Sequence, residues 1–449
     1  MKNITVDFQK TCGPVKPMHA VNNGPIYKFN PDQRVTNMDS WKAAGIPYSR
    51  LHDSPRCSTY GGPHIVDVNL IFTNFDADPT LPESYDFDNT DEYLRVIDFA
   101  GTMVFYRLGA SIEHWIKKYN TRPPKDFKKW AVICEHIIRH YTEGWANGFH
   151  YDIQYWEIWN EPDWGKRGGP NSATWGGTME EFYDFFEIAA KHLKTTFPHL
   201  KIGGPASVGK ADWCEIFLDE MRQRNVPLDF FSWHKYGSTV EKVTDFTKWI
   251  RETLDKAGYT ETESICNEWN YMKGWTNEDY VYSRKSIKGI KGASYTAAVM
   301  CACQYEAMDL LMYYDAKPCG FNGLFDSDVF SLVLKGYYPF KMFNELYKLG
   351  HCCQVETDEH LYACAAVNGD KAALMLTHFY DDDDQLPAEE IKLNFSGFTG
   401  ENGVKVFYYL LNKDRDMELI KEETITSGSV APTITADLFA SYLVTFEKL

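Results

Sequence analysis

The segment from Ile153 to Phe197 decides the fold of this chain. It opens with IQYWEIWNEP (153–162), a short apolar and aromatic run that stops at a proline, and it continues after a polar stretch as MEEFYDFFEIAAKHLKTTF (179–197). The first run has the length and the aromatic content of a buried strand, whereas the second repeats its apolar residues at helical spacing. The segment therefore predicts one strand followed by one helix.

Seven more apolar runs, each followed by an amphipathic stretch, occur between about residues 15 and 345. They are MHAVNNG (18–24), IPYSRLH (46–52), TMVFYRLG (102–109), KIGGPA (201–206), DFFSWHKYG (229–237), ESICNEW (263–269) and DLLMYYDA (309–316). Eight strand–helix units predict an α/β fold, the (β/α)8 TIM barrel, with functional residues at the carboxyl ends of the strands. The alternative is an open doubly wound sheet, but no GxGxxG motif follows a first strand.

The pattern changes after about residue 350 to short alternating runs between Gly, Asn and Asp turns, such as KAALMLTHFY (371–380) and VKVFYYLLN (404–412). Alternation of this kind predicts a β-sandwich. The opening NITVDFQ (3–9) also alternates and is expected to pair with it. We predict a catalytic barrel over 13–348 and an accessory β-sandwich over 1–12 and 349–449, with Asp381–Asp384 as a solvated turn.

The composition limits the partners. The 46 basic and 63 acidic side chains give a net charge of −17, which disfavours binding to nucleic acid or to an anionic membrane. The opening residues have no apolar signal core and no apolar run of membrane-spanning length occurs, so we expect a cytoplasmic protein. The 11 cysteines show neither zinc-like spacing nor a disulfide framework and are expected to be mostly buried thiols. No metal or cofactor is expected, and an oligomer is left open.

Two of the expected strands end in a glutamate. Glu161 lies two residues after IQYWEIW, and Glu268 lies near the end of ESICNEW. A lone glutamate in such a place is most often solvated or ion-paired. Because the carboxyl ends of barrel strands meet at one face, however, both are expected to face one pocket. Two carboxyl groups across a barrel mouth indicate glycoside hydrolysis, in which one group stays protonated to donate and the other is ionised.

Polar side chains at other strand ends fit the same chemistry. Candidates for binding the sugar or supporting the glutamates are Arg50, His52, Asn160, His234 and Tyr236. A guanidinium at Arg50 would also favour ionisation of a neighbouring carboxyl group. The alternatives are a structural ion pair for Arg50 and a satisfied core histidine for His234, which taken alone is the commoner role for such a residue.

Aromatic residues make up 15% of the chain, many of them in polar loops that suit a platform for a sugar ring. Trp164 and Trp269 follow the two glutamates and are candidate substrate contacts. Trp175 is a further stacking candidate close to Glu161. The alternative for these three, and for Trp275, is ordinary packing.

The motifs taken together resemble a known family. The resemblance rests on RLHD (50–53), WNEPD (159–163), WHKYG (233–237), NEWN (267–270), GFNGLFD (320–326) and KGYYPFKMFNEL (335–346). This ordered set is similar to glycoside hydrolase family 39, the family of β-xylosidases and α-L-iduronidases. Its clan of retaining (β/α)8 glycosidases carries the catalytic glutamates at the ends of the fourth and seventh barrel strands.

The resemblance implies roles for the candidates. Glu161 would be the acid/base and Glu268 the nucleophile of a double displacement through a glycosyl-enzyme, and Asn160 would bind the sugar 2-hydroxyl. The remaining polar candidates would support the glutamates or the sugar. The substrate would be an oligosaccharide or a small glycoside, cleaved as by an exo-glycosidase.

Departures from the family pattern bear on the substrate. Clan members commonly place a tryptophan at the end of the eighth strand, where this chain has Tyr313 and Tyr314. Iduronidase-like members tend to carry consecutive basic residues after the histidine of the sixth strand, whereas here Lys235 is followed by Tyr236. The comparison favours a β-xyloside or a related pentoside such as an α-L-arabinoside.

Two alternatives stay open. One is a uronide or an amino sugar as the substrate, with Lys166 and Arg167 or Lys235 as carboxylate contacts, and the other is a noncatalytic carbohydrate-binding barrel. Two long segments, SPRCSTYGG and its continuation after residue 53 and YMKGWTNEDYVYSRKSIKGI (271–290), are further expected to shape the pocket.

Overall fold

The computed structural model describes residues 1–27, 36–52, 64–114, 116–165, 169, 172–382, 387–426 and 429–449. Eight parallel strands close into a barrel in sequence order, with the first strand pairing to the last. The strands are β2 (Ala20–Asn22), β3 (Tyr48–Leu51), β4 (Met103–Leu108), β5 (Tyr155–Ile158), β6 (Lys201–Ser207), β7 (Phe230–Gly237), β8 (Glu263–Tyr271) and β9 (Leu310–Tyr313). The predicted (β/α)8 barrel is confirmed.

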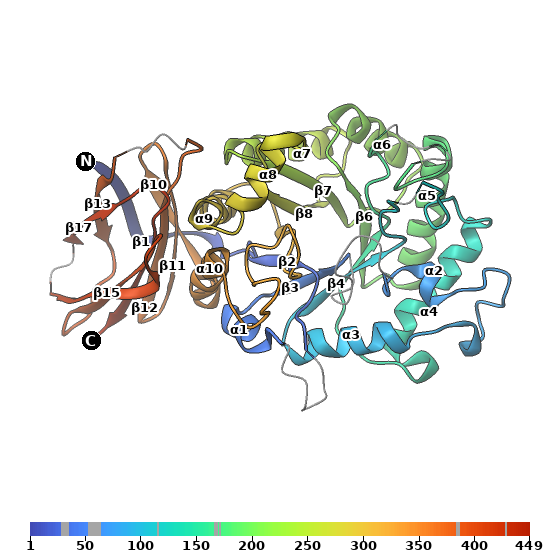
Figure 1. Ribbon diagram of the computed structural model, residues 1–449, viewed down its shortest axis with the longest axis horizontal. Helices are drawn as coiled ribbons and strands as arrows, with labels where there is room; N and C mark the ends of the chain where they lie inside the picture. The colour runs from blue at the N-terminus through green and yellow to red at the C-terminus, as the bar shows by residue number, and fades with distance from the viewer. Residues whose placement is uncertain are drawn as a thin grey trace.

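Each barrel strand is followed by a helix that packs on the outside (Figure 1). These helices are α1 (Met38–Ala44), α3 (Asp88–Phe99), α4 (Phe127–Glu143), α5 (Met179–Thr196), α6 (Ala211–Gln223), α7 (Glu241–Lys256), α9 (Ile290–Gln304) and α10 (Tyr338–Leu349). Two shorter helices, α2 (Val68–Ile71) and α8 (Asn277–Ser286), lie in the long segments after β3 and β8. Single turns of 3-10 helix occur at Pro82–Ser84, Trp145–Asn147 and Lys335–Tyr337.

The unit formed by β5 and α5 shows why this part of the sequence folds so firmly. A capping box starts α5: the Thr178 side chain accepts from the Glu181 N–H, and the Glu181 carboxylate accepts from the Thr178 N–H. Phe182, Phe185 and Phe186 recur at helical spacing and have no exposed surface. Truncating one such side chain to alanine typically costs about 3–5 kcal/mol, so this face holds α5 against the barrel.

The rest of the chain forms one curled, mainly antiparallel sheet of ten strands beside the barrel. Its strands are β1 (Lys2–Pro14), β10 (His351–Thr357), β11 (Leu361–Asn368), β12 (Lys371–His378), β13 (Glu389–Ser396), β14 (Val404–Leu411), β15 (Asp416–Ile425), β16 (Ser429–Val430), β17 (Thr433–Ala436) and β18 (Ser441–Lys448). The sheet folds over its own apolar core, which includes Val6, Leu393 and Phe446. The predicted sandwich is confirmed as two facing parts of one continuous sheet.

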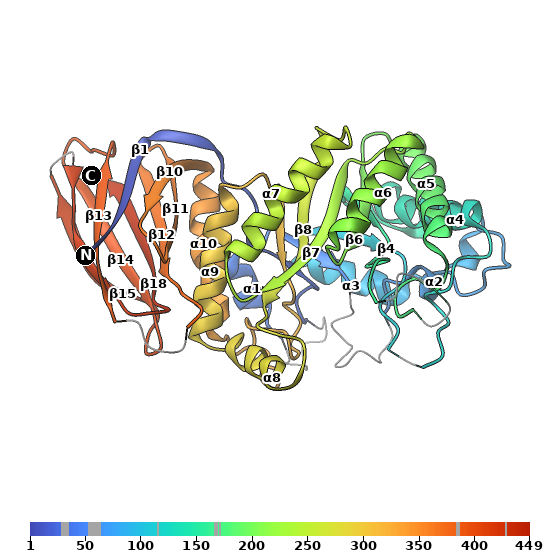
Figure 2. The same ribbon diagram turned by 90° about the horizontal axis from the view of Figure 1, so that it is seen from above.

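The N-terminal strand joins the sheet as predicted. β1 pairs antiparallel with β10 and parallel with β13, and then crosses to the barrel (Figure 2). Both chain termini therefore lie in the sheet, away from the barrel. The sheet packs on α9 and α10, where Cys301, Cys303 and Cys352 are buried thiols in a core that continues into the barrel.

The prediction of a solvated acidic turn is wrong for Asp381. The Tyr271 hydroxyl donates to its Oδ1 atom at 2.7 Å, and the Lys291 ammonium lies 2.7 Å from the same oxygen. Asp381 thus connects the sheet to β8 and α9. A run of acidic residues in the sequence does not reveal such a tertiary contact. Asp383 and Asp384 lie outside the described residues. In the described part of the chain, no helix has both the length and the apolar character to span a bilayer.

Candidate active site

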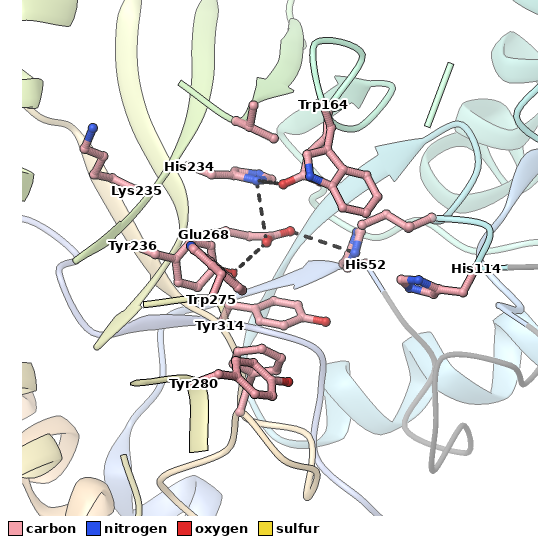
Figure 3. Close-up of a pocket in the computed structure, with 14 residues that line it drawn as sticks. His52, His114, Trp164, His234, Lys235, Tyr236, Glu268, Trp275, Tyr280 and Tyr314 are labelled. Carbon is pink, nitrogen blue, oxygen red and sulfur yellow. Dashed lines mark hydrogen bonds and ion pairs between the residues drawn. The ribbon is translucent and has the colours of Figure 1, made fainter. Parts of the chain in front are cut away.

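A cavity of about 600 Å3 opens at the carboxyl ends of the barrel strands (Figure 3). Its described lining residues are His52, Ile112, His114, Glu161, Trp164, Val208, His234, Lys235, Tyr236, Glu268, Trp275, Tyr280, Tyr314 and Phe321. We call the polar group Arg50, Asn160, His234, Tyr236 and Glu268 the floor; all of these are buried except Tyr236, which is half-buried. We call the aromatic group Trp164, Trp275, Tyr280 and Phe321 the rim.

The backbone makes a tight turn where β5 ends and places Glu161 over the cavity. Trp159 and Glu161 adopt positive φ angles of 75° and 49°, and the Glu161 N–H donates to the Ala206 carbonyl at 3.0 Å. Residues other than glycine rarely adopt such angles, which concentrate at functional sites. Only 8% of the Glu161 surface is exposed, so its carboxyl group lies in an environment that disfavours charge.

Glu268 enters the cavity from β8, where the ladder is irregular. Trp233 pairs with Cys266 and His234 with Glu268, so Asn267 is one extra residue in β8 relative to β7. A bulge of this kind re-aims the side chains around it. The Glu268 carboxylate accepts from Arg50 Nη1 at 2.8 Å and from the Tyr236 hydroxyl at 2.9 Å.

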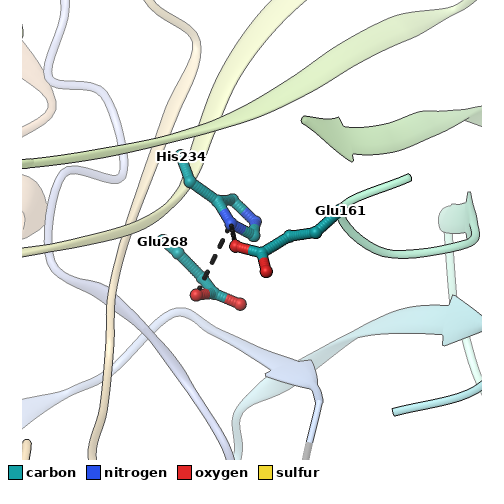
Figure 4. Close-up of side chains that lie close together, drawn as sticks. All are labelled: Glu161, His234 and Glu268. Carbon is teal, nitrogen blue, oxygen red and sulfur yellow. Dashed lines mark hydrogen bonds and ion pairs between the residues drawn. The ribbon is translucent and has the colours of Figure 1, made fainter. Parts of the chain in front are cut away.

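His234 lies between the two glutamates (Figure 4). Its Nδ1 atom is 2.7 Å from Glu161 Oε1 and 3.5 Å from Glu268 Oε2. One oxygen of each carboxyl group and one ring nitrogen of His234 all lie within 4.8 Å of one another. His52 approaches Glu268 from the other side, with Nε2 3.9 Å from Oε1. The structure therefore brings both predicted glutamates and both predicted histidines together.

Burial separates the ionisation of these groups. Burial, aided by the negative charge of Asp163 and opposed by Arg50, raises the pKa of Glu161 to about 8. Burial also lowers the pKa of His234 to about 4, which keeps the ring neutral at pH 7. The pKa of Glu268 is raised by burial as well, but Arg50 and the Tyr236 hydroxyl both favour its charged form. Glu161 is thus suited to carry a proton, and Glu268 has the groups that stabilise a carboxylate.

Arg50 lies at the centre of the hydrogen-bond network of the floor and has no exposed surface. Besides Glu268 it donates through Nε to the Glu157 carboxylate at 2.7 Å and through Nη2 to the side-chain oxygen Oδ1 of Asn160 at 2.7 Å. Nη1 also contacts the side-chain oxygen of Asn22 at 3.0 Å. The Asn160 amide nitrogen, by contrast, is buried and has no hydrogen-bond partner within the described structure. It is a donor available to a ligand.

The rim is aromatic and comes from several elements. Trp164 follows β5, Trp275 and Tyr280 lie in the segment before and within α8, and Phe321 lies after β9. Trp164 and Trp275 remain 40% and 56% exposed. The expected role of segment 271–290 in shaping the pocket is therefore seen, whereas residues 53–63 of the other long segment lie outside the described residues.

Not every predicted contact reaches the cavity. Trp269 is fully buried, with its ring against Tyr313 and Tyr295, and Trp175 packs against Trp159. Substrate contact by Trp269 is corrected to packing, because the side chain leaves β8 on the face opposite Glu268. Of the two tyrosines that stand where clan members commonly place a tryptophan, Tyr314 is among the described residues that line the cavity and Tyr313 is not.

Sequence reasoning missed several residues of the site. Glu157 and Asn22 bind Arg50 from β5 and β2, and Tyr280, Phe321 and His114 line the cavity. A glutamate inside the apolar run YWEI was a signal that could have been used, because a buried carboxylate in a strand needs a cation. The loop residues carried no such signal.

Glu161, His234 and Glu268 are also the one set of described residues whose ligand atoms are close enough together to hold a metal ion. The Arg50 guanidinium, 2.8 Å from Glu268, would repel a cation bound there. The same carboxyl pair suits proton donation and nucleophilic attack, for which Arg50 is favourable.

Part of the chain is similar in sequence to known glycoside hydrolases. Residues 68–266, from α2 to β8, match the family model of the glycosyl hydrolases family 39. The chain is 32% identical over 149 residues to a β-xylosidase of Geobacillus stearothermophilus and 28% identical over 269 residues to one of Caldicellulosiruptor saccharolyticus. These matches cover 32% and 57% of this chain, but only 27% and 50% of the relatives' own lengths.

The fold is similar along the whole chain to that of solved structures. A glucosidase from Croceicoccus marinus superimposes with a TM-score of 0.80 at 21% sequence identity, covering 100% of this chain and 99% of the other. At this identity the likeness concerns the fold, including the barrel and the flanking sheet.

Proposed function

We propose that this chain, of which residues 68–266 match the model of the glycosyl hydrolases family 39, is a retaining exo-glycosidase that acts on β-xylosides or related neutral pentosides. The observation that carries the proposal is the pair of buried carboxyl groups, Glu161 and Glu268, whose nearest oxygens lie within 4.8 Å. Retaining enzymes hold their carboxyl groups about 5–5.5 Å apart, whereas inverting enzymes need about 6.5–9.5 Å to admit water. The short separation supports retention.

In the first step, Glu268 attacks the anomeric carbon and the bond to the aglycone oxygen breaks. Glu161 gives its proton to that oxygen, so the aglycone leaves as a neutral alcohol. His234 Nδ1 contacts Glu161 Oε1, and the second oxygen points away from the ring (Figure 4). With the ring proton on Nδ1, His234 donates to Oε1 and leaves the transferable proton on Oε2.

In the second step, water attacks the anomeric carbon of the glycosyl-enzyme. Its proton passes to Glu161, now a carboxylate, and the ester electrons return to Glu268. The Asn160 amide nitrogen, which has no partner in the described structure, is assigned to the sugar 2-hydroxyl. Tyr236 and Arg50 hold Glu268 in position for both steps.

The cavity favours a neutral sugar over a uronide. Lys235 is the one lysine or arginine among the described lining residues, and its ammonium lies 3.9 Å from the centre of the Phe246 ring. In Figure 3 this side chain points away from the glutamates. Lys166 and Arg167, the other candidates for a carboxylate contact, lie outside the described residues. The uronide therefore remains the second candidate, and a noncatalytic sugar-binding barrel is the third.

A panel of nitrophenyl glycosides tests the proposal. We expect hydrolysis of β-D-xyloside, with α-L-arabinoside next, and little of the β-D-glucuronide, measured as nitrophenol release. Proton NMR of the first-formed sugar should show the anomeric configuration of the substrate. Inversion would contradict the mechanism, and binding of xylose or xylobiose without turnover of any glycoside would favour the noncatalytic barrel.

A further inference from the structure

Glu157 is a buried carboxylate that binds Arg50, and the two-glutamate mechanism does not use it. It lies in β5 four residues before Glu161, has no exposed surface and is absent from the cavity lining. It accepts from Arg50 Nε at 2.7 Å, from the Ser232 hydroxyl at 2.6 Å and from the Asn267 amide. A carboxylate bonded in this way on every side cannot touch the substrate.

The negative charges that contact Arg50 outnumber its single positive charge. One guanidinium serves two carboxylates, Glu157 through Nε and Glu268 through Nη1, and its remaining described contacts, Asn22 and Asn160, are neutral. When Glu268 becomes an ester it loses its charge. Arg50 would then be a buried cation with no anion beside it, which is costly in a protein interior, unless Glu157 still faced it.

We propose that Glu157 is a positioning residue that shares Arg50 with the nucleophile, so that Arg50 keeps an anionic partner while the glycosyl-enzyme exists. The inference rests on the proposed function of Glu268. In the free enzyme the sharing weakens the hold of Arg50 on Glu268 and leaves that carboxylate more nucleophilic. In the intermediate, the Arg50–Glu157 ion pair remains complete after the Arg50–Glu268 pair has lost its charge.

The two chemical steps should respond in opposite directions to loss of the Glu157 charge. Without it, Arg50 stabilises only the ionised Glu268, so forming the ester removes the one anion facing the cation and becomes slower. Breaking the ester restores that anion, so the second step is not slowed. Damage to the fold alone would slow both steps.

The pH dependence gives a second signature. Glu268 is faced by Arg50 from β3 and His52 directly after it, and by Glu161 from the turn after β5. His234 and Tyr236 face it from β7, and Cys266 lies near it on its own strand. Replacing Glu157 by a neutral residue removes a nearby negative charge and leaves Glu268 as the one carboxylate that Arg50 binds among its described contacts. Both changes favour the charged form of Glu268, so the acidic limb of kcat/KM moves to lower pH.

The experiment compares Glu157→Gln with Ser232→Ala, which removes a neutral hydrogen bond to the same carboxylate but leaves every charge in place. For a dinitrophenyl glycoside, kcat/KM reports formation of the intermediate, and burst kinetics separate its breakdown. In Glu157→Gln we expect kcat/KM to fall on the order of 10²-fold while breakdown is unchanged or faster. Ser232→Ala should leave the ratio of the two steps and the acidic limb as in wild type.

Equal slowing of both steps in Glu157→Gln, or an acidic limb that does not move, would overturn the inference. If Glu157→Gln does not fold, Glu157→Asp is the second variant, because its shorter side chain moves the carboxylate away from Arg50. It should change the ratio of the two step rates and the acidic limb of kcat/KM in the same directions as Glu157→Gln, but by less. Wild-type protein that hydrolyses no glycoside would instead contradict the proposed function, so the two failures are distinguishable.

Discussion

The floor and the rim of the cavity are built on opposite principles. On the floor, Glu268 is 5% exposed and Arg50 is fully enclosed by the polar groups that it binds. On the rim, Trp164 and Trp275 leave 40% and 56% of their surface open, and they come from segments outside the strands. The floor is fixed by short hydrogen bonds between strands, whereas the rim offers free apolar surface.

From this difference we expect the floor to carry out the chemical steps and the rim to bind the substrate. Charges that must be held to within a fraction of an ångström belong on rigid strands, where hydrogen bonds fix the side chains that carry them. Aromatic surface that accepts a sugar or an aryl group needs no such precision, because stacking tolerates displacement along the ring. Changes to the floor should therefore alter rate and pH dependence, and changes to the rim should alter KM.

The largest effect is expected from Glu268→Gln. Removal of the attacking carboxylate should lower kcat on every glycoside by about 10⁴-fold or more, including those with good leaving groups. Glu263→Gln, on the same strand but ion-paired with Lys201 at the far end, is the matched control and should stay active. Near wild-type turnover by Glu268→Gln would place the nucleophile elsewhere and break the assignment of the floor.

Glu161→Ala should have a smaller effect that depends on the leaving group. The first step should slow by about 10²–10⁴-fold for alkyl glycosides, whose leaving oxygen needs a proton, but persist for dinitrophenyl glycosides, which do not need one. Azide should rescue breakdown of the accumulated glycosyl-enzyme and give a glycosyl azide of retained configuration. Equal losses on both substrate types without azide rescue would make Glu161 an ordinary loop carboxylate.

Two tryptophans near Glu161 sharpen the comparison between rim and core. Trp164→Ala should raise KM for aryl glycosides about fivefold with little change in melting temperature, because the ring is exposed at the cavity mouth. Trp175→Ala should instead destabilise the fold by about 3–5 kcal/mol, since that ring is buried against Trp159. Thermal unfolding and Michaelis constants for both variants check this, and an unchanged KM in Trp164→Ala would remove Trp164 from the rim.

The smallest effect on rate is expected from Asp163→Asn, which should change the pH profile instead. In wild type, kcat/KM should fall as the pH rises through about 8, where Glu161 loses the proton that it must donate. The negative charge of Asp163 helps to hold that proton, so its removal should move the basic limb to lower pH. A basic limb that stays in place or rises would mean that Asp163 does not influence Glu161.

The sequence alone determined the barrel and the pair of glutamates. Local periodicity identifies strands and helices, and the closure of eight parallel strands brings all their carboxyl ends to one face, so Glu161 and Glu268 could be placed together without coordinates. Arg50 could be expected near Glu268 for the same reason. These conclusions need only the order of elements and the direction of the strands.

Tertiary structure decided which side chains at those ends point inward and what they bind. The bulge at Asn267 breaks the alternation of β8, so counting by twos could not tell that both Asn267 and Glu268 face the barrel interior while Trp269 is buried in the packing. The division of Arg50 between Glu157 and Glu268, and the exposure of Trp275 rather than Trp269, depend on distances between strands and loops far apart in the chain. A periodic pattern in the sequence shows which residues form a helix or a strand. Contacts between those elements determine which way each side chain points and what it binds.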